Sequence, residues 1–138
     1  EDVEQEDFEK MLSLNFYSAF HLAKGFLPLF KKQGKGTFLF VGARPALIPS
    51  DGAGVVPYAF SKKLVIALAE TIGEEIRNTD IRSHIFVPSI IDTPPNRESM
   101  PDADFEKWVS PSEIADSMHY AVNNRALRNM TFKLYGQS

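Results

Sequence analysis

Tyr58-Ala59-Phe60-Ser61-Lys62 is the stretch around which this chain is organised, and it follows a loop rich in Gly and Pro. It is expected at the start of a helix, where positions four apart share one face. The phenol of Tyr58 and the ammonium of Lys62 can then point into the same cleft. A free tyrosine, with a pKa of ~10, holds its proton too tightly to work near neutrality, and a nearby cation favours the phenolate and lowers that pKa. The stretch therefore predicts a general acid.

A long helix and a short strand are expected before this stretch. From about Glu4 to Lys32 apolar residues recur at three- and four-residue steps, the helical period, over more than one face. A helix of that kind needs cover on most sides. Gln33 to Gly36 supplies a helix stop and a turn. Thr37 to Val41 is rich in aromatic and β-branched residues, which is typical of a strand buried on both faces of a parallel sheet.

The later part of the chain continues this alternation. The elements expected there are a loop from Ala43 to Pro57, a helix from Tyr58 to Asn78, a strand from Arg82 to Val87 and a last strand from Thr131 to Tyr135. Pro88 should end the second strand. Ser89 to Trp108 is polar and broken by prolines, which is typical of a lid or site loop. Ser110 and Glu113 form a capping box that starts a helix ending near Asn123.

Strands separated by helices predict an α/β fold with about three parallel strands and flanking helices, in a single domain over residues 1–138. In such sheets, sites lie beyond the carboxyl ends of the strands. Ala43, Tyr58 and the segment from Ser89 to Thr93 all lie at or after those ends. The site is therefore expected there.

Composition narrows the classes of function. The net charge of −3 leaves no electrostatic footprint for nucleic acid or for an anionic membrane, so neither partner is expected. The absence of cysteine removes thiolate catalysis and Cys-ligated metal sites. His21, His84 and His119 lie far apart without metal spacing, so no metal site is expected. An acidic N-terminus and the lack of a long apolar run favour a cytoplasmic location.

Three motifs together resemble the short-chain dehydrogenase/reductase family, in the carboxy-terminal half of its Rossmann-type domain. Tyr58 and Lys62 match the catalytic pair of the family. Asn15 matches the helix asparagine that holds a water linking that lysine to solvent. Pro88 to Thr93 resembles the family's Pro-Gly-x-x-x-Thr segment, whose Thr93 equivalent contacts the nicotinamide carboxamide. The resemblance implies that Tyr58, Lys62, Pro88 and Thr93 bind the cofactor.

The similarity runs from about Phe8 to Gly136, with one departure inside the site. The position of the family's catalytic serine is occupied by Ala43, which has no hydroxyl. Losing one preorganised donor of this kind costs about 100-fold to 1000-fold in rate. Ser50, later in the same loop, is a possible replacement or an ordinary loop serine. Ser61 is interpreted as a packing residue, and Ser89 replaces a glycine.

A second departure concerns the nucleotide. The family begins with a strand, a glycine-rich turn and a helix that hold the cofactor pyrophosphate. Gly52 to Pro57 comes nearest to such a turn, but it lacks the third glycine and lies well beyond its strand. The chain is thus expected to form a partial Rossmann-like three-layer fold. The choice between NAD and NADP cannot be made from these residues.

Two functions follow. The first is an NAD(P)-dependent oxidoreductase acting on a small alcohol or carbonyl compound, incomplete and inactive as this chain alone. The alternative is a non-catalytic association module derived from that family. The strand from Thr37 to Val41 would have an unpaired edge, and the broad apolar faces of the helices over 4–32 and 58–78 favour a homo-oligomer. A chance pairing of Tyr58 and Lys62 on an unrelated domain stays open.

Overall fold

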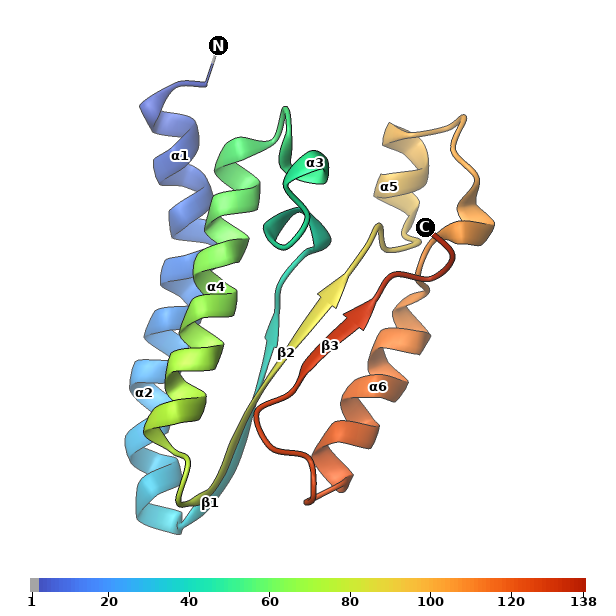
Figure 1. Ribbon diagram of the computed structural model, residues 1–138. Helices are drawn as coiled ribbons and strands as arrows, with labels where there is room; N and C mark the ends of the chain where they lie inside the picture. The colour runs from blue at the N-terminus through green and yellow to red at the C-terminus, as the bar shows by residue number, and fades with distance from the viewer. Residues whose placement is uncertain (1–2) are drawn as a thin grey trace.

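The computed structural model describes residues 3–138 and begins with one long rod of helix. The rod consists of α1 (Gln5–Met11), a π-helical turn η1 (Leu12–Tyr17) and α2 (Ser18–Gln33), which follow one another without a break (Figure 1). It ends at Gly34, whose φ of 79° is the left-handed conformation of a helix C-cap. The predicted helix over 4–32 is confirmed. The π-helical turn within it was not predicted.

Three strands form one parallel sheet in the order β1-β2-β3. Their bounds are β1 (Lys35–Val41), β2 (Asp80–Pro88) and β3 (Thr131–Leu134). Each pair of successive strands is separated by at least one helix, which is why the strands run parallel. The prediction of three parallel strands is confirmed. The first two strands are longer than expected, and Pro88 is the last residue of β2.

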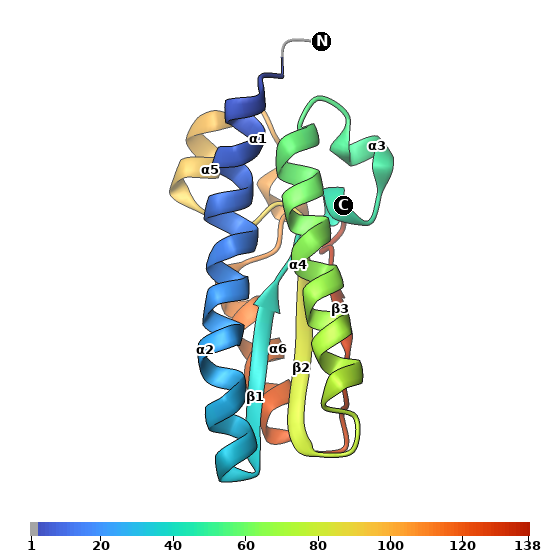
Figure 2. The same ribbon diagram turned by 90° about the vertical axis from the view of Figure 1, so that its left-hand side faces the viewer.

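Helices cover both faces of the sheet, giving three layers (Figure 1). The long rod and α4 (Val56–Glu75) stand side by side in front of one face, as Figure 2 shows, and α6 (Pro111–Asn123) lies on the other. The main core lies between the sheet and the layer formed by the rod and α4. Its buried members include Ala23, Phe38, Phe40, Val65, Ile66, Ala69, Ile72, Ile81, Ile85 and Val87.

The two segments expected to be loops contain short helices. Residues 43–57 hold η2 (Arg44–Ala46) and α3 (Pro49–Gly52), and residues 89–108 hold α5 (Pro94–Ser99) and η3 (Phe105–Lys107). In η2, α3 and α5 a proline occupies one of the first two helical positions, where its missing N–H costs nothing. Helix α4 begins at Val56, two residues earlier than expected, and Pro57 occupies one of its first two positions. Proline here starts helices as well as interrupting them.

The capping box of α6 is confirmed. The hydroxyl of Ser110 accepts a hydrogen bond from the Glu113 N–H at 3.2 Å, and the Glu113 carboxylate accepts one from the Ser110 N–H at 2.8 Å. The bond from the Ser110 N–H to the Glu113 carboxylate, together with one from the Ser110 hydroxyl to the same oxygen at 2.8 Å, holds the pKa of Glu113 below its usual range. Two otherwise unpaired donors at the helix start are thereby satisfied.

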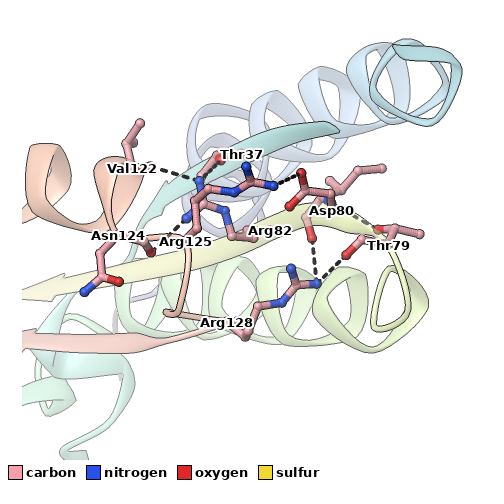
Figure 3. A network of polar contacts seen from close by, with 9 residues as sticks. Thr37, Thr79, Asp80, Arg82, Val122, Asn124, Arg125 and Arg128 are labelled. Atoms are coloured by element: carbon pink, nitrogen blue, oxygen red, sulfur yellow. Dashed lines mark hydrogen bonds and ion pairs between the residues drawn. The ribbon is translucent and has the colours of Figure 1, made fainter. Parts of the chain in front are cut away.

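Arg82 fastens the other end of α6 to the sheet, as Figure 3 shows. Its buried guanidinium donates to the carbonyl oxygens of Ala121, Val122 and Asn124 and to the hydroxyl of Thr37, at 2.9 to 3.2 Å. These carbonyls lie at the C-terminal end of the helix, where a cation is favourable. The contact fixes α6 against β2.

The outer edge of β1 is unpaired, as predicted. Within residues 3–138, β1 has β2 as its one neighbouring strand. A groove of about 450 Å³ runs along this edge. Its apolar lining comes from α2 and β1, and includes Leu22, Phe26, Phe30, Phe38 and Phe40. The sheet thus ends in an open, apolar side.

Candidate functional site

A cleft of about 680 Å³ lies at the carboxyl ends of β1 and β2. The short helices α3 and α5 and the C-terminus gather at this end of the sheet (Figure 1). The cleft is lined by residues of both strand ends, of the segments that follow them and of α4: Val41, Gly42, Ala43, Arg44, Pro45, Asp51, Val55, Tyr58, Lys62, Pro88, Ser89, Ile90, Ile91, Asn96 and Met100. The location agrees with that expected for a parallel α/β sheet.

Tyr58 and Lys62 come together in this cleft from the first turns of α4. Tyr58 keeps 36% of its surface exposed, so an incoming molecule can reach it. The Lys62 ammonium donates to the carbonyl oxygen of Val41, the last residue of β1, at 3.1 Å. The lysine is thus held at the strand end, beside the tyrosine.

Burial sets the ionisation of this pair. Desolvation raises the pKa of Tyr58 above its usual value and lowers the pKa of Lys62 below its own. The expectation that Lys62 lowers the pKa of Tyr58 is therefore not met in the chain as it stands. Both shifts favour the uncharged forms, and a neutral phenol can donate a proton but is a weak base.

Ala43 directly follows Gly42 at the end of β1 and is buried in the cleft wall. Its side chain offers no hydrogen-bond donor. Ser50 lies on α3 with its side chain exposed, and it is not among the residues that line the cleft. Its neighbour Asp51 does line it. The structure therefore gives no support to Ser50 as a replacement for the missing hydroxyl.

Arg44 and Asp51 are cleft residues that the sequence did not single out. Arg44 Nε donates to Asp51 Oδ2 at 2.5 Å, and Arg44 Nη1 donates to Ser138 Oγ at 2.9 Å. The guanidinium also stacks over the ring of Tyr135, with its carbon 5.6 Å from the ring centroid. The pair ties the loop after β1 to the C-terminus. The signal available in the sequence was a charged residue three positions after the end of the first strand.

Asn15 lies outside the cleft. It belongs to the π-helical turn and lines the groove beside β1. Its carboxamide Nδ2 donates to the hydroxyl of Ser61 at 3.0 Å, and that hydroxyl donates to the carbonyl oxygen of Tyr58 at 2.8 Å. The structure therefore links Asn15 to the tyrosine through Ser61, a residue that the sequence suggested only as packing.

The segment after β2 is partly as expected. Pro88 is buried and lines the cleft, whereas Thr93 stands at the N-cap position of α5 without a capping side-chain hydrogen bond and is not among the lining residues. Ser89 donates from its N–H to the carbonyl of Leu134 and from its hydroxyl to that of Tyr135, both at 2.9 Å. The residue in the glycine position therefore ties this segment to the end of β3.

Among residues 3–138 there is no group of three or more His, Asp or Glu side chains that could hold a metal ion. Across the same described part of the chain, no helix is both long and apolar enough to cross a membrane.

A three-stranded parallel sheet with a tyrosine and a lysine at its carboxyl end defines an α/β protein of the Rossmann-like class. The sequence model of the family described as short chain dehydrogenase matches residues 1–104. The chain belongs to this family.

Individual relatives agree with this assignment. A tropinone reductase homolog of Arabidopsis thaliana is 29% identical over 109 residues, which are 79% of this chain and 41% of the relative. The dehydrogenase/reductase SDR family member 4 of Homo sapiens is 30% identical over 67% of this chain and 32% of its own length. The chain therefore spans less than half the length of these two relatives.

Solved structures support the fold. An actinorhodin polyketide ketoreductase with NADPH superposes with a TM-score of 0.85 at 20% identity, over 98% of this chain and 60% of that one. A 4-hydroxyisoleucine dehydrogenase complexed with NADH gives a TM-score of 0.80 at 18% identity, over 99% and 62%. Almost all of this chain thus corresponds to a part of a larger fold.

Proposed function

We propose that this chain is the catalytic part of an NAD(P)-dependent oxidoreductase that interconverts a small alcohol and its carbonyl compound. The observation that carries the proposal is the joint presence of Tyr58 and Lys62 in one cleft at the carboxyl ends of β1 and β2, within a family of dehydrogenases. The apolar lining from Val55, Ile90 and Met100 suits an uncharged substrate body.

A bound nicotinamide would supply or accept the hydride, and side chains of the protein would donate or accept the proton. In the reducing direction Tyr58, a neutral phenol near pH 7 as any unperturbed tyrosine is, donates its proton to the carbonyl oxygen. Lys62, held by its hydrogen bond to the Val41 carbonyl, stabilises in its protonated form the phenolate that remains. Asn15 keeps the proton relay behind the pair in place. Ala43 leaves the substrate oxygen with one donor fewer than the family arrangement provides.

The cleft fits the nicotinamide end of the cofactor. The residues that would hold it are Tyr58, Lys62, Pro88 and Thr93, of which all but Thr93 line the cleft. The glycine-rich segment nearest to a phosphate-binding turn does not fit, because Gly52 is the last residue of the short helix α3 and Gly54 follows it, so neither glycine follows a strand. Both NADH and NADPH accompany the similar structures, so either cofactor is compatible with the proposal.

We therefore propose that residues 1–138 form one partial domain that is inactive alone. Supplied with the dinucleotide-binding half of a relative, in trans or as a fusion, the chain should acquire NADH- or NADPH-dependent ketone reduction. Tyr58→Phe should reduce that rate by at least about 100-fold. Tyr120→Phe, at an exposed position on α6 that does not line the cleft, is the matched control and should leave it unchanged.

Calorimetric titration of the 138-residue chain with each cofactor tests its incompleteness. We expect no binding in the micromolar range, because the pyrophosphate site is missing. Clear binding, or turnover by the chain alone that depends on Tyr58, would contradict the incompleteness. A completed chain with no turnover would contradict the oxidoreductase.

A second candidate is a non-catalytic association module, and Ala43 together with the exposed apolar helices favours it. Large apolar side chains are exposed along the rod and α4: Leu14, Tyr17, Phe20, Leu22, Phe26, Leu29, Phe60 and Leu64. Exposed apolar surface on this scale is typical of an interface. Under either function we propose a homo-oligomer formed through the helices over 4–32 and 58–78.

A further inference from the structure

Ser61 is a fully buried side chain between the two residues proposed to act in the cleft, and the chemistry above does not use it. Its hydroxyl accepts a hydrogen bond from Asn15 Nδ2 at 3.0 Å and donates one to the carbonyl oxygen of Tyr58 at 2.8 Å. The single hydroxyl thus serves as acceptor and donor at once. The hydroxyl therefore links Asn15 in the long helix to the first turn of α4, and its own donor and acceptor are both satisfied inside the protein.

The contact joins the π-helical turn of the long helix to the first turns of α4. Asn15 lies in the π-helical turn, a wide and rare conformation that needs support from its surroundings. Tyr58 lies in the first turn of α4. The rings of Phe8 and Phe60, with centroids 6.2 Å apart, pack at the same junction of the two helices. Ser61 provides the polar contact in this otherwise apolar junction.

We propose that Ser61 is a positioning residue, which fixes the turn of α4 carrying Tyr58 and Lys62 against the π-helical turn carrying Asn15. The inference rests on the proposed role of Tyr58 as the acid. A catalytic group displaced by a fraction of an ångström loses much of its effect, so a fixed helix start matters to the chemistry. Without the hydroxyl, Asn15 Nδ2 would lose its hydrogen bond to α4, and the two helices would be less firmly fixed against each other.

Comparing Ser61→Ala with Ser83→Ala tests the proposal without turnover. Ser83 is a matched control, because it is also buried and its hydroxyl donates to a carbonyl of α4, that of Ala69, at 2.8 Å. The readout is a pH titration of the chain labelled with ¹³C at tyrosine Cζ, with the Tyr58 signal assigned by Tyr58→Phe. The charged groups sharing the cleft with Tyr58 are Lys62, Arg44 and Asp51, and both variants retain them.

In Ser61→Ala, the loosened phenol should become more exposed to water, and the Tyr58 pKa should fall towards its usual value by more than the error of the titration. The side-chain amide of Asn15 should exchange faster with solvent. Ser83→Ala should change neither. Asn15→Ala removes the same contact from the other side and should reproduce the Tyr58 shift, which covers the case in which Ser61→Ala does not fold.

An unchanged Tyr58 titration in Ser61→Ala or in Asn15→Ala would overturn the proposal. An equal shift in Ser83→Ala would overturn it as well, because the effect would then be general loosening. None of these readouts needs a cofactor. Failure of the oxidoreductase proposal, seen as a completed chain without turnover, is therefore distinguishable from failure of this one.

Discussion

Arg82 is a buried cation whose hydrogen bonds go to the last carbonyls of α6 and to Thr37. Arg82→Met should leave these acceptors unpaired, so we expect the free energy of unfolding to fall by about 3 kcal/mol. Arg125→Met is the control: Arg125 pairs with Asp80 at the surface with 76% of its side chain exposed, and its loss should cost less than about 0.5 kcal/mol. Urea unfolding measures both, and equal effects would contradict the assigned role of Arg82.

Ala43 is the residue at which the cleft departs most from its family. In the chain completed with a dinucleotide-binding half, Ala43→Ser should raise the proposed rate of ketone reduction by about 100-fold, because a hydroxyl here would add a donor for the substrate oxygen. Ser50→Ala should leave the rate unchanged, because Ser50 is exposed and lies outside the cleft lining. Steady-state kinetics on the two variants distinguish the positions. A loss of activity in Ser50→Ala would restore Ser50 as the replacement donor.

At the scale of elements, the capping box makes the start of α6 sensitive to acid. The pKa of Glu113 in the folded chain lies below its unfolded value of ~4.3, so its contribution is complete above that value. The contribution is lost as the pH falls through the folded pKa. The protection of amides in the first turn of α6, measured against intrinsic exchange at the same pH, should therefore fall at acidic pH. In Glu113→Gln, which keeps a capping side chain without a charge, this fall in protection should be smaller.

The strength of a local signal decided which elements the sequence predicted. The capping box at Ser110 and the apolar period of the long helix were enough to place both helices. The short helices α3 and α5 were missed because proline was interpreted as a breaker, although it also suits the first turn of a helix. The π-helical turn leaves no signal in the apolar period. It depends on tertiary contacts, as the Asn15–Ser61 hydrogen bond illustrates.

The sequence predicted the two residues on α4 that line the cleft, but not the residues that the loops bring there. Spacing placed Tyr58 and Lys62 in one cleft correctly, because a helix fixes the relation of positions four apart. The direction of the Tyr58 pKa was wrong, because burial depends on loops packed around the helix rather than on its own sequence. Arg44 and Asp51 were missed for the same reason: their pairing needs the path of the loop between them.

At the scale of the whole molecule, the exposed apolar side chains of the rod and α4 predict association. The chain should be a dimer or larger at micromolar concentrations, measured by sedimentation velocity. Leu64→Glu would place a charge in the proposed interface and should shift the distribution towards monomer. Tyr120→Glu, at an exposed position on α6 away from these helices, should not. A wild-type chain that sediments as a monomer at every concentration would refute the assembly.

The π-helical turn has a consequence for how the long helix tolerates changes of length. A π turn holds more residues than an α turn, so it absorbs an inserted residue without rotating the helix on either side. Deleting a residue within Leu12–Tyr17 would convert the turn to ordinary α-helix while the apolar stripes before and after it kept their facing. The same deletion in α2 would turn every following side chain by about 100° relative to the sheet. A single deletion in this rod therefore keeps the facing of the flanking helices in one short segment and changes it elsewhere.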